Sequence, residues 1–226
     1  MAEHDAGGVV LNKVTVADHT VLRRLVLLGT PLALALLEIF HPEQPSGASG
    51  AVEQGAWFMW FHIIQVPLIG LIALAVYLLT DGLEGRAASV SRWAIGVFVI
   101  FFSAYDAAAG IGTGYALRNA QELSAEGQAA VYEVVKELPL FSLPFVLSVV
   151  GTLGWAVALI AAAIALRRAG ASRGPFILLI LAGVFLMAGH PYPQGTLAFG
   201  CFFLATAWLE LAPGRLTSAS EPSRVS

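Results

Sequence analysis

Charged residues and cysteine are scarce in this sequence. Only 12% of its 226 residues are charged, whereas 58% are hydrophobic; an average soluble domain has about 25% charged residues. This composition excludes an ordinary soluble domain and a disordered chain. The 12 basic residues do not outnumber the 15 acidic ones, so no basic surface for nucleic acid is expected. The single cysteine, Cys201, excludes an internal disulfide, a CxxC redox pair and covalent haem attachment.

Long apolar runs are what the sequence has instead. A membrane-spanning helix needs about 20 mostly apolar residues, and six runs approach or exceed that length: 22–41, 56–80, 93–118, 140–165, 175–189 and 195–211. The runs are continuous rather than alternating, which excludes a β-barrel. None contains lysine, which excludes a retinal Schiff base. We therefore expect an all-α polytopic membrane protein, a bundle of six transmembrane helices in which the last two form a tight hairpin.

The basic residues predict the orientation of these helices. With the N-terminus in the cytoplasm, only Arg118 and Lys136 fall outside, as the positive-inside rule requires. Both termini are then cytoplasmic. The transmembrane domain spans residues 22–211, between an N-terminal segment (1–21) and a tail (212–226) whose composition predicts disorder. Without an organellar targeting pattern, we expect a multi-pass protein of a prokaryotic plasma membrane.

The loop between the third and fourth runs contains a helical pattern. Val131, Val134, Val135 and Leu138 recur at helical spacing, while charged residues take the other faces. This periodicity predicts a short amphipathic helix. It would lie on the outer membrane surface and cover whatever lies beneath, or serve only as a connector.

Ionisable residues inside apolar runs need an explanation, because each costs at least about 2.5–3.5 kcal/mol at the centre of a membrane helix. Glu38, His62 and Asp106 lie within runs, and His41 and His190 lie at run ends. The predicted orientation places all three of these histidines on the outer side.

The three histidines are expected at one depth. Aromatic residues 57–61 resemble an interfacial belt, so His62 would lie about 5 Å below the outer edge of the hydrocarbon. Glu38 precedes His41 by three residues and shares its helix face. Three imidazoles and a carboxylate suit a divalent metal such as zinc. We therefore predict His41, His62 and His190 as metal ligands, and Glu38 as a ligand or catalytic base.

Such a centre predicts a metal-dependent hydrolase of lipids or small amphiphiles, since zinc-bound water can attack an ester or amide. Gln65, one turn after His62, would be a supporting partner.

Asp106 is expected deeper in the bundle. Its helix and that of His62 run in opposite directions, and side chains lean toward their own N-terminus. We therefore expect about 10 Å between Asp106 and the histidines along the membrane normal, and a role as a buried base, proton relay or ion ligand. In the stretch after it, Gly110 and Gly114 form a small-residue face typical of close helix packing.

Three alternatives to a hydrolase remain open. A b-type haem protein would use two of the histidines as axial ligands. A proton- or ion-coupled transporter or channel subunit would use Asp106, and six spans would then favour a homo-oligomer. A non-catalytic assembly component would need only packing. In each case the lipid bilayer is the expected surrounding, with a lipid-like small molecule as the partner of the hydrolase.

Overall fold

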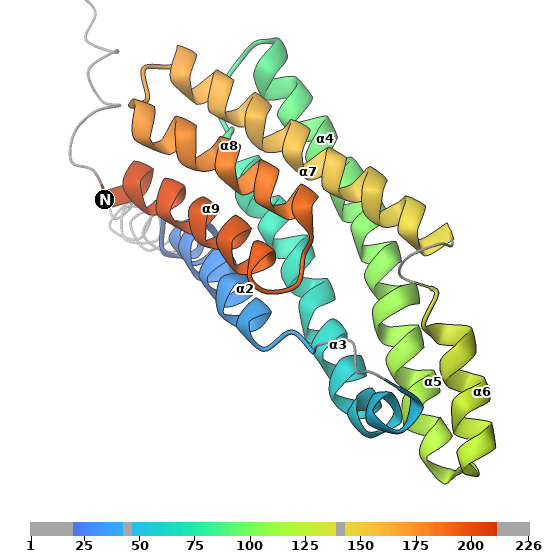
Figure 1. Cartoon of the computed structure of the whole chain (residues 1–226). Helices are drawn as coiled ribbons and strands as arrows, with labels where there is room; N and C mark the ends of the chain where they lie inside the picture. The colour runs from blue at the N-terminus through green and yellow to red at the C-terminus, as the bar shows by residue number, and fades with distance from the viewer. Residues whose placement is uncertain (1–19, 43–46, 139–142, 212–226) are drawn as a thin grey trace, which may run out of the picture.

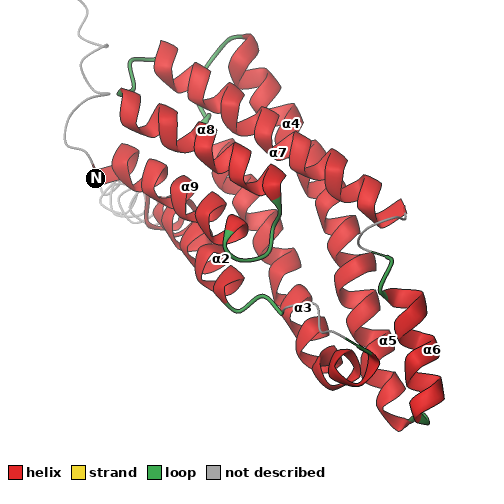
Figure 2. Cartoon of the chain, viewed as in Figure 1, coloured by secondary structure: helices red, strands yellow, loops and turns green. Residues whose placement is uncertain are grey.

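The described part of the protein is entirely helical. The computed structural model describes residues 20–42, 47–138 and 143–211 (Figure 1), and the elements within these ranges are helices joined by short loops (Figure 2). The expected all-α class is therefore confirmed. The predicted disordered tail and most of the predicted N-terminal segment lie outside the described residues.

Within the described residues, four helices are long and apolar enough to cross a membrane: Thr20–Ile39, Ala48–Leu79, Arg86–Glu122 and Leu143–Arg168. Large apolar side chains are exposed along them, among them Ile100 and Trp93, which is 82% exposed. Soluble proteins rarely expose large apolar patches. Length, composition and surface together indicate a membrane protein.

Two of these four helices contain π-helical turns. The first comprises the π-turn Leu25–Gly29 followed by α2 (Thr30–Ile39). The third comprises α4 (Arg86–Tyr105), the π-helical stretch η2 (Asp106–Gly112), α5 (Thr113–Asn119) and the 3₁₀ turn η3 (Ala120–Glu122). π-Helical turns inside α-helices frequently mark functional sites.

The last two helices form the expected hairpin. α8 (Arg173–Ala188) has 16 residues and α9 (Gln194–Leu211) has 18. They pack side by side and are joined by residues 189–193 (Figure 1).

Neighbouring helices close a ring in the order α2, α3 (Ala48–Leu79), α4, α7 (Leu143–Arg168), α8 and α9, with α9 returning to α2. The ring is filled by aromatic side chains. The indole of Trp155 on α7 contacts the rings of Phe98, Phe199 and Phe202, and its Nε1 donates a hydrogen bond to the carbonyl oxygen of Ala182 at 3.0 Å. This contact pairs a polar group that would otherwise be buried unsatisfied.

Arginines bind backbone carbonyls at the end of the ring where α3 passes into α4. Arg23 donates to the carbonyl oxygen of Leu78 at 3.0 Å and to Glu210 at 2.9 Å. Arg92 donates to the carbonyl oxygens of Thr80 and Leu83. These bonds bring charged donors to the carbonyls at and just beyond the C-terminus of α3.

The opposite end carries an extension formed by the start of α3, α5 and α6 (Ala125–Val135) (Figure 1). The predicted amphipathic helix is thus confirmed as a helix. Its Val135 packs against Ala51 and Val52 of α3 and Leu117 of α5. Val52 precedes His62 by ten residues, or about 15 Å along α3, so the described contacts of α6 lie well away from that histidine.

α3 begins earlier than the sequence indicated. We expected the second span to start at residue 56, with the aromatic residues 57–61 near its end, but the helix starts at Ala48. Residues 48–55 are small or polar, which hides a helix from a hydropathy pattern although they pack against α5. His62 therefore lies near the middle of a helix of 32 residues, about 48 Å long.

Candidate metal centre

Three histidines meet where shorter helices end against the middle of α3. His41 lies two residues beyond α2, His190 lies two residues beyond α8, and His62 is within α3. One ring nitrogen from each lies within 4.8 Å of the others. The Nε2 atoms of His41 and His190 are 3.0 Å apart. The convergence of these three imidazoles, predicted from the sequence, is confirmed.

The hydrogen bonds of two histidines fix their tautomers. His41 Nδ1 lies 2.9 Å from the carbonyl oxygen of Pro42, and His62 Nδ1 lies 2.8 Å from that of Phe58. A carbonyl oxygen only accepts, so each Nδ1 must carry the proton. Each Nε2 then keeps its lone pair, the arrangement usual for metal-ligating histidines.

Burial favours neutral imidazoles at the two histidines that lie in loops beyond the ends of α2 and α8. It lowers the pKa of His41 to about 4, and the neighbouring His62 contributes to this shift. Burial, with His41 and His62 nearby, also lowers the pKa of His190 well below its usual value. Neutral imidazole is the form that binds a metal.

Aromatic rings surround the cluster. The ring of Phe61 lies 4.8 Å from that of His41, and the ring of Phe58 lies 4.6 Å from that of His62. On the α4 side, the rings of Phe102 and Tyr105 lie 5.6 and 5.8 Å from that of His190. This apolar wall limits access of water and holds the rings in place.

Two glycines allow the close packing around the cluster. A Cβ at Gly110 would lie 2.3 Å from Cγ and Cδ2 of His62. A Cβ at Gly195 on α9 would lie 1.8 Å from the carbonyl oxygen of His190 and 3.0 Å from Cδ of Glu38. The packing interpretation of the glycine stretch is supported by Gly110 and by Gly114, which meets the backbone of Met59.

Glu38 lies three residues before His41 in the chain. It is not part of the group formed by the histidine nitrogens. Its side chain is fully buried, and its Oε1 accepts a hydrogen bond from Gln65 Nε2 at 2.6 Å. Gln65 was predicted to support His62. Its amide instead supports the carboxyl group of Glu38, because α2 and α3 pack against each other at this level.

Asp106 is also fully buried, and neither of its carboxyl oxygens has a hydrogen-bond partner. The contact between Gly110 and His62 puts Asp106 about one helical turn, roughly 6 Å, from the level of His62. This offset refers to the backbone; the expected separation of about 10 Å between the side chains, which lean in opposite directions along their helices, stays a prediction. Like Glu38, Asp106 is outside the group of histidine nitrogens.

Tyr105, Phe102 and Gly195 also shape the centre, although the sequence analysis did not select them. Tyr105 was detectable as the neighbour of Asp106. Gly195 carries no signal of its own, since only the meeting of α9 with α2 gives it a role.

The contact between His41 and His190 disfavours a haem held by that pair. His41 and His190 lie with ring centroids 4.8 Å apart and nitrogens in direct contact. Two axial ligands must stand on opposite faces of a porphyrin, which needs a separation of about 4 Å between their nitrogens and an open plane between the rings. A single small ion fits this arrangement better.

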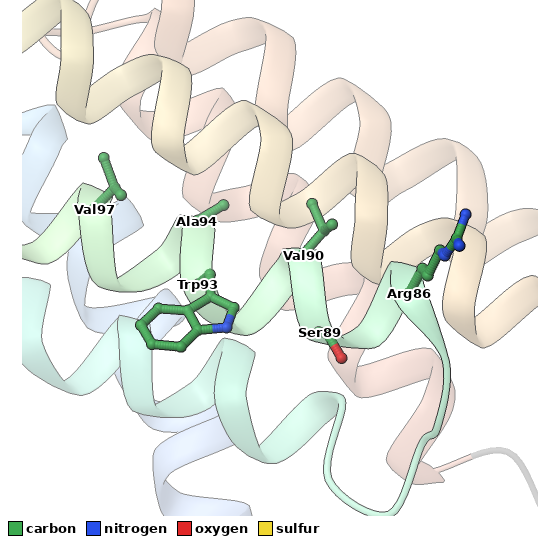
Figure 3. Close-up of a pocket in the computed structure, with 6 residues that line it drawn as sticks. All are labelled: Arg86, Ser89, Val90, Trp93, Ala94 and Val97. Carbon is green, nitrogen blue, oxygen red and sulfur yellow. The ribbon is translucent and has the colours of Figure 1, made fainter.

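A shallow groove elsewhere on the surface does not belong to this centre. Its lining residues all come from α4: Arg86, Ser89, Val90, Trp93, Ala94 and Val97 (Figure 3). This is the start of α4, whereas Tyr105, which contacts His190, is at its end. No protein-family model, curated protein or solved structure matches the chain.

Proposed function

We propose that the protein is a membrane-embedded metalloenzyme that hydrolyses lipids or small amphiphiles. One observation carries the proposal: three imidazoles converge from separate segments, and backbone carbonyls hold the Nδ1 protons of His41 and His62, so that their Nε2 atoms keep a lone pair. His41, His62 and His190 would bind a divalent metal. Zinc is the best candidate, because three neutral histidines with an open fourth position are a common catalytic zinc site.

The chemistry follows from that donor set. Zinc lowers the pKa of a bound water to about 7 and so supplies a nucleophile for an ester or amide. Glu38 and Asp106 would accept or return protons about one helical turn from the histidines. Their burial gives them the water-poor surroundings in which carboxyl groups are used for acid–base catalysis.

A lipid-like substrate is favoured by where the centre lies. His41 and His190 are half-buried residues in loops beyond the ends of α2 and α8, which puts the centre near the surface of the bundle. The neighbouring helices expose apolar residues such as Phe40 and Trp60. An amphiphile could place its tail along these side chains and its polar group at the histidines.

We also propose six spans in a cell membrane, with both termini cytoplasmic. The ring order supports this, since α8 and α9 pack within the same ring as the four longer helices. The 16 residues of α8 extend about 24 Å. A helix of this length can cross a thin bilayer if it is not tilted and its flanking loops enter the interface. The arginines at the α3–α4 end would then face the cytoplasm.

The test of the metal centre is elemental analysis of purified protein after zinc loading and removal of excess metal. We expect about one zinc per chain, and its loss in the His41→Ala, His62→Ala and His190→Ala variants. His19→Ala is the matched control, because it removes a histidine predicted to lie outside the bundle. No zinc in the wild type, or equal zinc in His62→Ala, contradicts the proposal.

Hydrolysis is tested separately on zinc-loaded protein in detergent. A panel of short-chain and long-chain ester and amide amphiphiles should reveal activity that a chelator removes and zinc restores. Activity unchanged in His190→Ala would show that the hydrolysis comes from a contaminant.

A further inference from the structure

Four buried oxygen atoms without partners lie beside the histidine cluster. They are Glu38 Oε2, Gln65 Oε1 and both carboxyl oxygens of Asp106. All three side chains are fully buried. A buried polar atom without a partner is costly, and a bound ion is one of the species that can satisfy it.

These three side chains come from different helices but share one level. The hydrogen bond from Gln65 to Glu38 joins α3 to α2. Gln65 follows His62 by three residues, and Asp106 precedes Gly110, which contacts His62, by four. Since α3 and α4 run in opposite directions, Gln65 and Asp106 lie on the same side of His62, each about one helical turn away. The carboxyl groups of Glu38 and Asp106 lie close enough for an electrostatic interaction.

Within the described residues, no ion pair brings a positive charge to this layer. The ion pairs found in the described residues involve Glu210 and Glu133, and neither Glu38 nor Asp106 takes part in one. Two carboxylates in a dry site repel each other and are stable as a pair only with a counter-ion or protons.

We propose that Glu38, Gln65 and Asp106 form a second cation site that binds a hard divalent ion such as Mn²⁺, Mg²⁺ or Ca²⁺. Carboxylate and amide oxygens are the ligands that these ions prefer, whereas the imidazoles nearby prefer zinc. Two carboxylates balance the charge of one divalent ion, and while they hold it they would not serve as the proton carriers named for the hydrolase. The two sites thus differ in donor chemistry, and the second does not depend on the histidines.

Gly195 on α9 leaves room for a bound ion beside Glu38. Its bare backbone faces the carboxyl group of Glu38, where a Cβ would stand 3.0 Å from Cδ. The π-helical stretch begins at Asp106 itself, and π-helical turns inside α-helices frequently occur at functional sites.

The experiment uses Mn²⁺ as the probe, because its free form gives an electron paramagnetic resonance signal that disappears on binding. Full-length protein in detergent, with zinc already bound, is titrated with Mn²⁺. We expect saturable binding of about one ion, weakened at least tenfold in Asp106→Asn and in Glu38→Gln. Ser91→Ala, a change at another buried oxygen of α4, should bind as the wild type does.

The outcomes separate this site from the histidine centre. His190→Ala should lose zinc and keep Mn²⁺, whereas Asp106→Asn should lose Mn²⁺ and keep zinc; retained zinc also shows that the variant is folded. Absence of saturable Mn²⁺ binding in the wild type, or unchanged binding in both carboxyl variants, overturns the proposal. Loss of Mn²⁺ in His190→Ala also overturns it, because the ion would then be in the histidine centre.

Discussion

The backbone of Gly110 lies directly against the imidazole of His62, so closely that a Cβ at this position would stand 2.3 Å from two ring atoms. Atoms cannot approach that closely, so any side chain at residue 110 must displace the ring or separate α3 from η2. The position of His62 Nε2 therefore depends on a residue that has no functional group.

Gly110→Ala should weaken zinc binding without removing any ligand. Displacing a ligating imidazole has an effect like that of losing its orienting partner, which costs about 10–100-fold in metal affinity. Competition with a chromophoric chelator measures that affinity. Gly96→Ala is the matched control, because it lies on α4 with open space around its Cβ position and should bind zinc as the wild type does. Equal affinity in Gly110→Ala would show that His62 is not a ligand.

Gln65→Leu should destabilise the protein. The change removes the donor to Glu38 Oε1 and leaves that buried oxygen unpaired, at a cost of about 1–3 kcal/mol. A lowered midpoint of thermal unfolding in detergent would report it. Gln128→Leu, which changes an exposed side chain bonded to Leu123, should leave the midpoint nearly unchanged. Equal shifts in the two variants would contradict a structural role for the Gln65–Glu38 bond.

The helical class and the three histidines were predictable because each rests on a local signal. Apolar runs mark helices, and His41, His62 and His190 stand out because ionisable residues are rare near such runs. Orientation then placed them at one level without any knowledge of packing.

The layer of Glu38, Gln65 and Asp106 was not predictable in the same way. It depends on how far one helix slides along another, and that register is set where Gly110 meets His62. A hydropathy pattern fixes the centre of a span only to within a turn or two, as the early start of α3 shows. A difference of one turn in this register moves Asp106 from a position near the histidines to one well below them.

Arg23→Gln should cost about 1 kcal/mol or more of stability. Arg23 joins Glu210 of α9 to the carbonyl oxygen of Leu78 near the end of α3, and hydrogen bonds from a charged donor are stronger than neutral ones. Thermal unfolding at low and high salt measures the effect. Arg24→Gln is the control, because its Nε is 3.9 Å from Glu210 and its side chain is 55% exposed, a geometry that contributes little. A larger loss of stability in Arg24→Gln than in Arg23→Gln would show that Arg24, and not Arg23, makes the stabilising contact with Glu210.

The proposed topology is tested by labelling single cysteines in intact cells. Cys201→Ser first removes the one native thiol. Glu126→Cys then places a thiol on the exposed surface of α6, and Ala169→Cys places one in the exposed turn between α7 and α8. If both termini are cytoplasmic, a membrane-impermeant maleimide should label residue 126 in intact cells and residue 169 only after permeabilisation.

The reverse labelling pattern would show that the protein has the opposite orientation. The histidines would then lie on the cytoplasmic side of the membrane and not on the outer side, as proposed. Labelling of both residues in intact cells would rule out the alternation of spans on which the orientation depends, because α7 must separate them by one crossing.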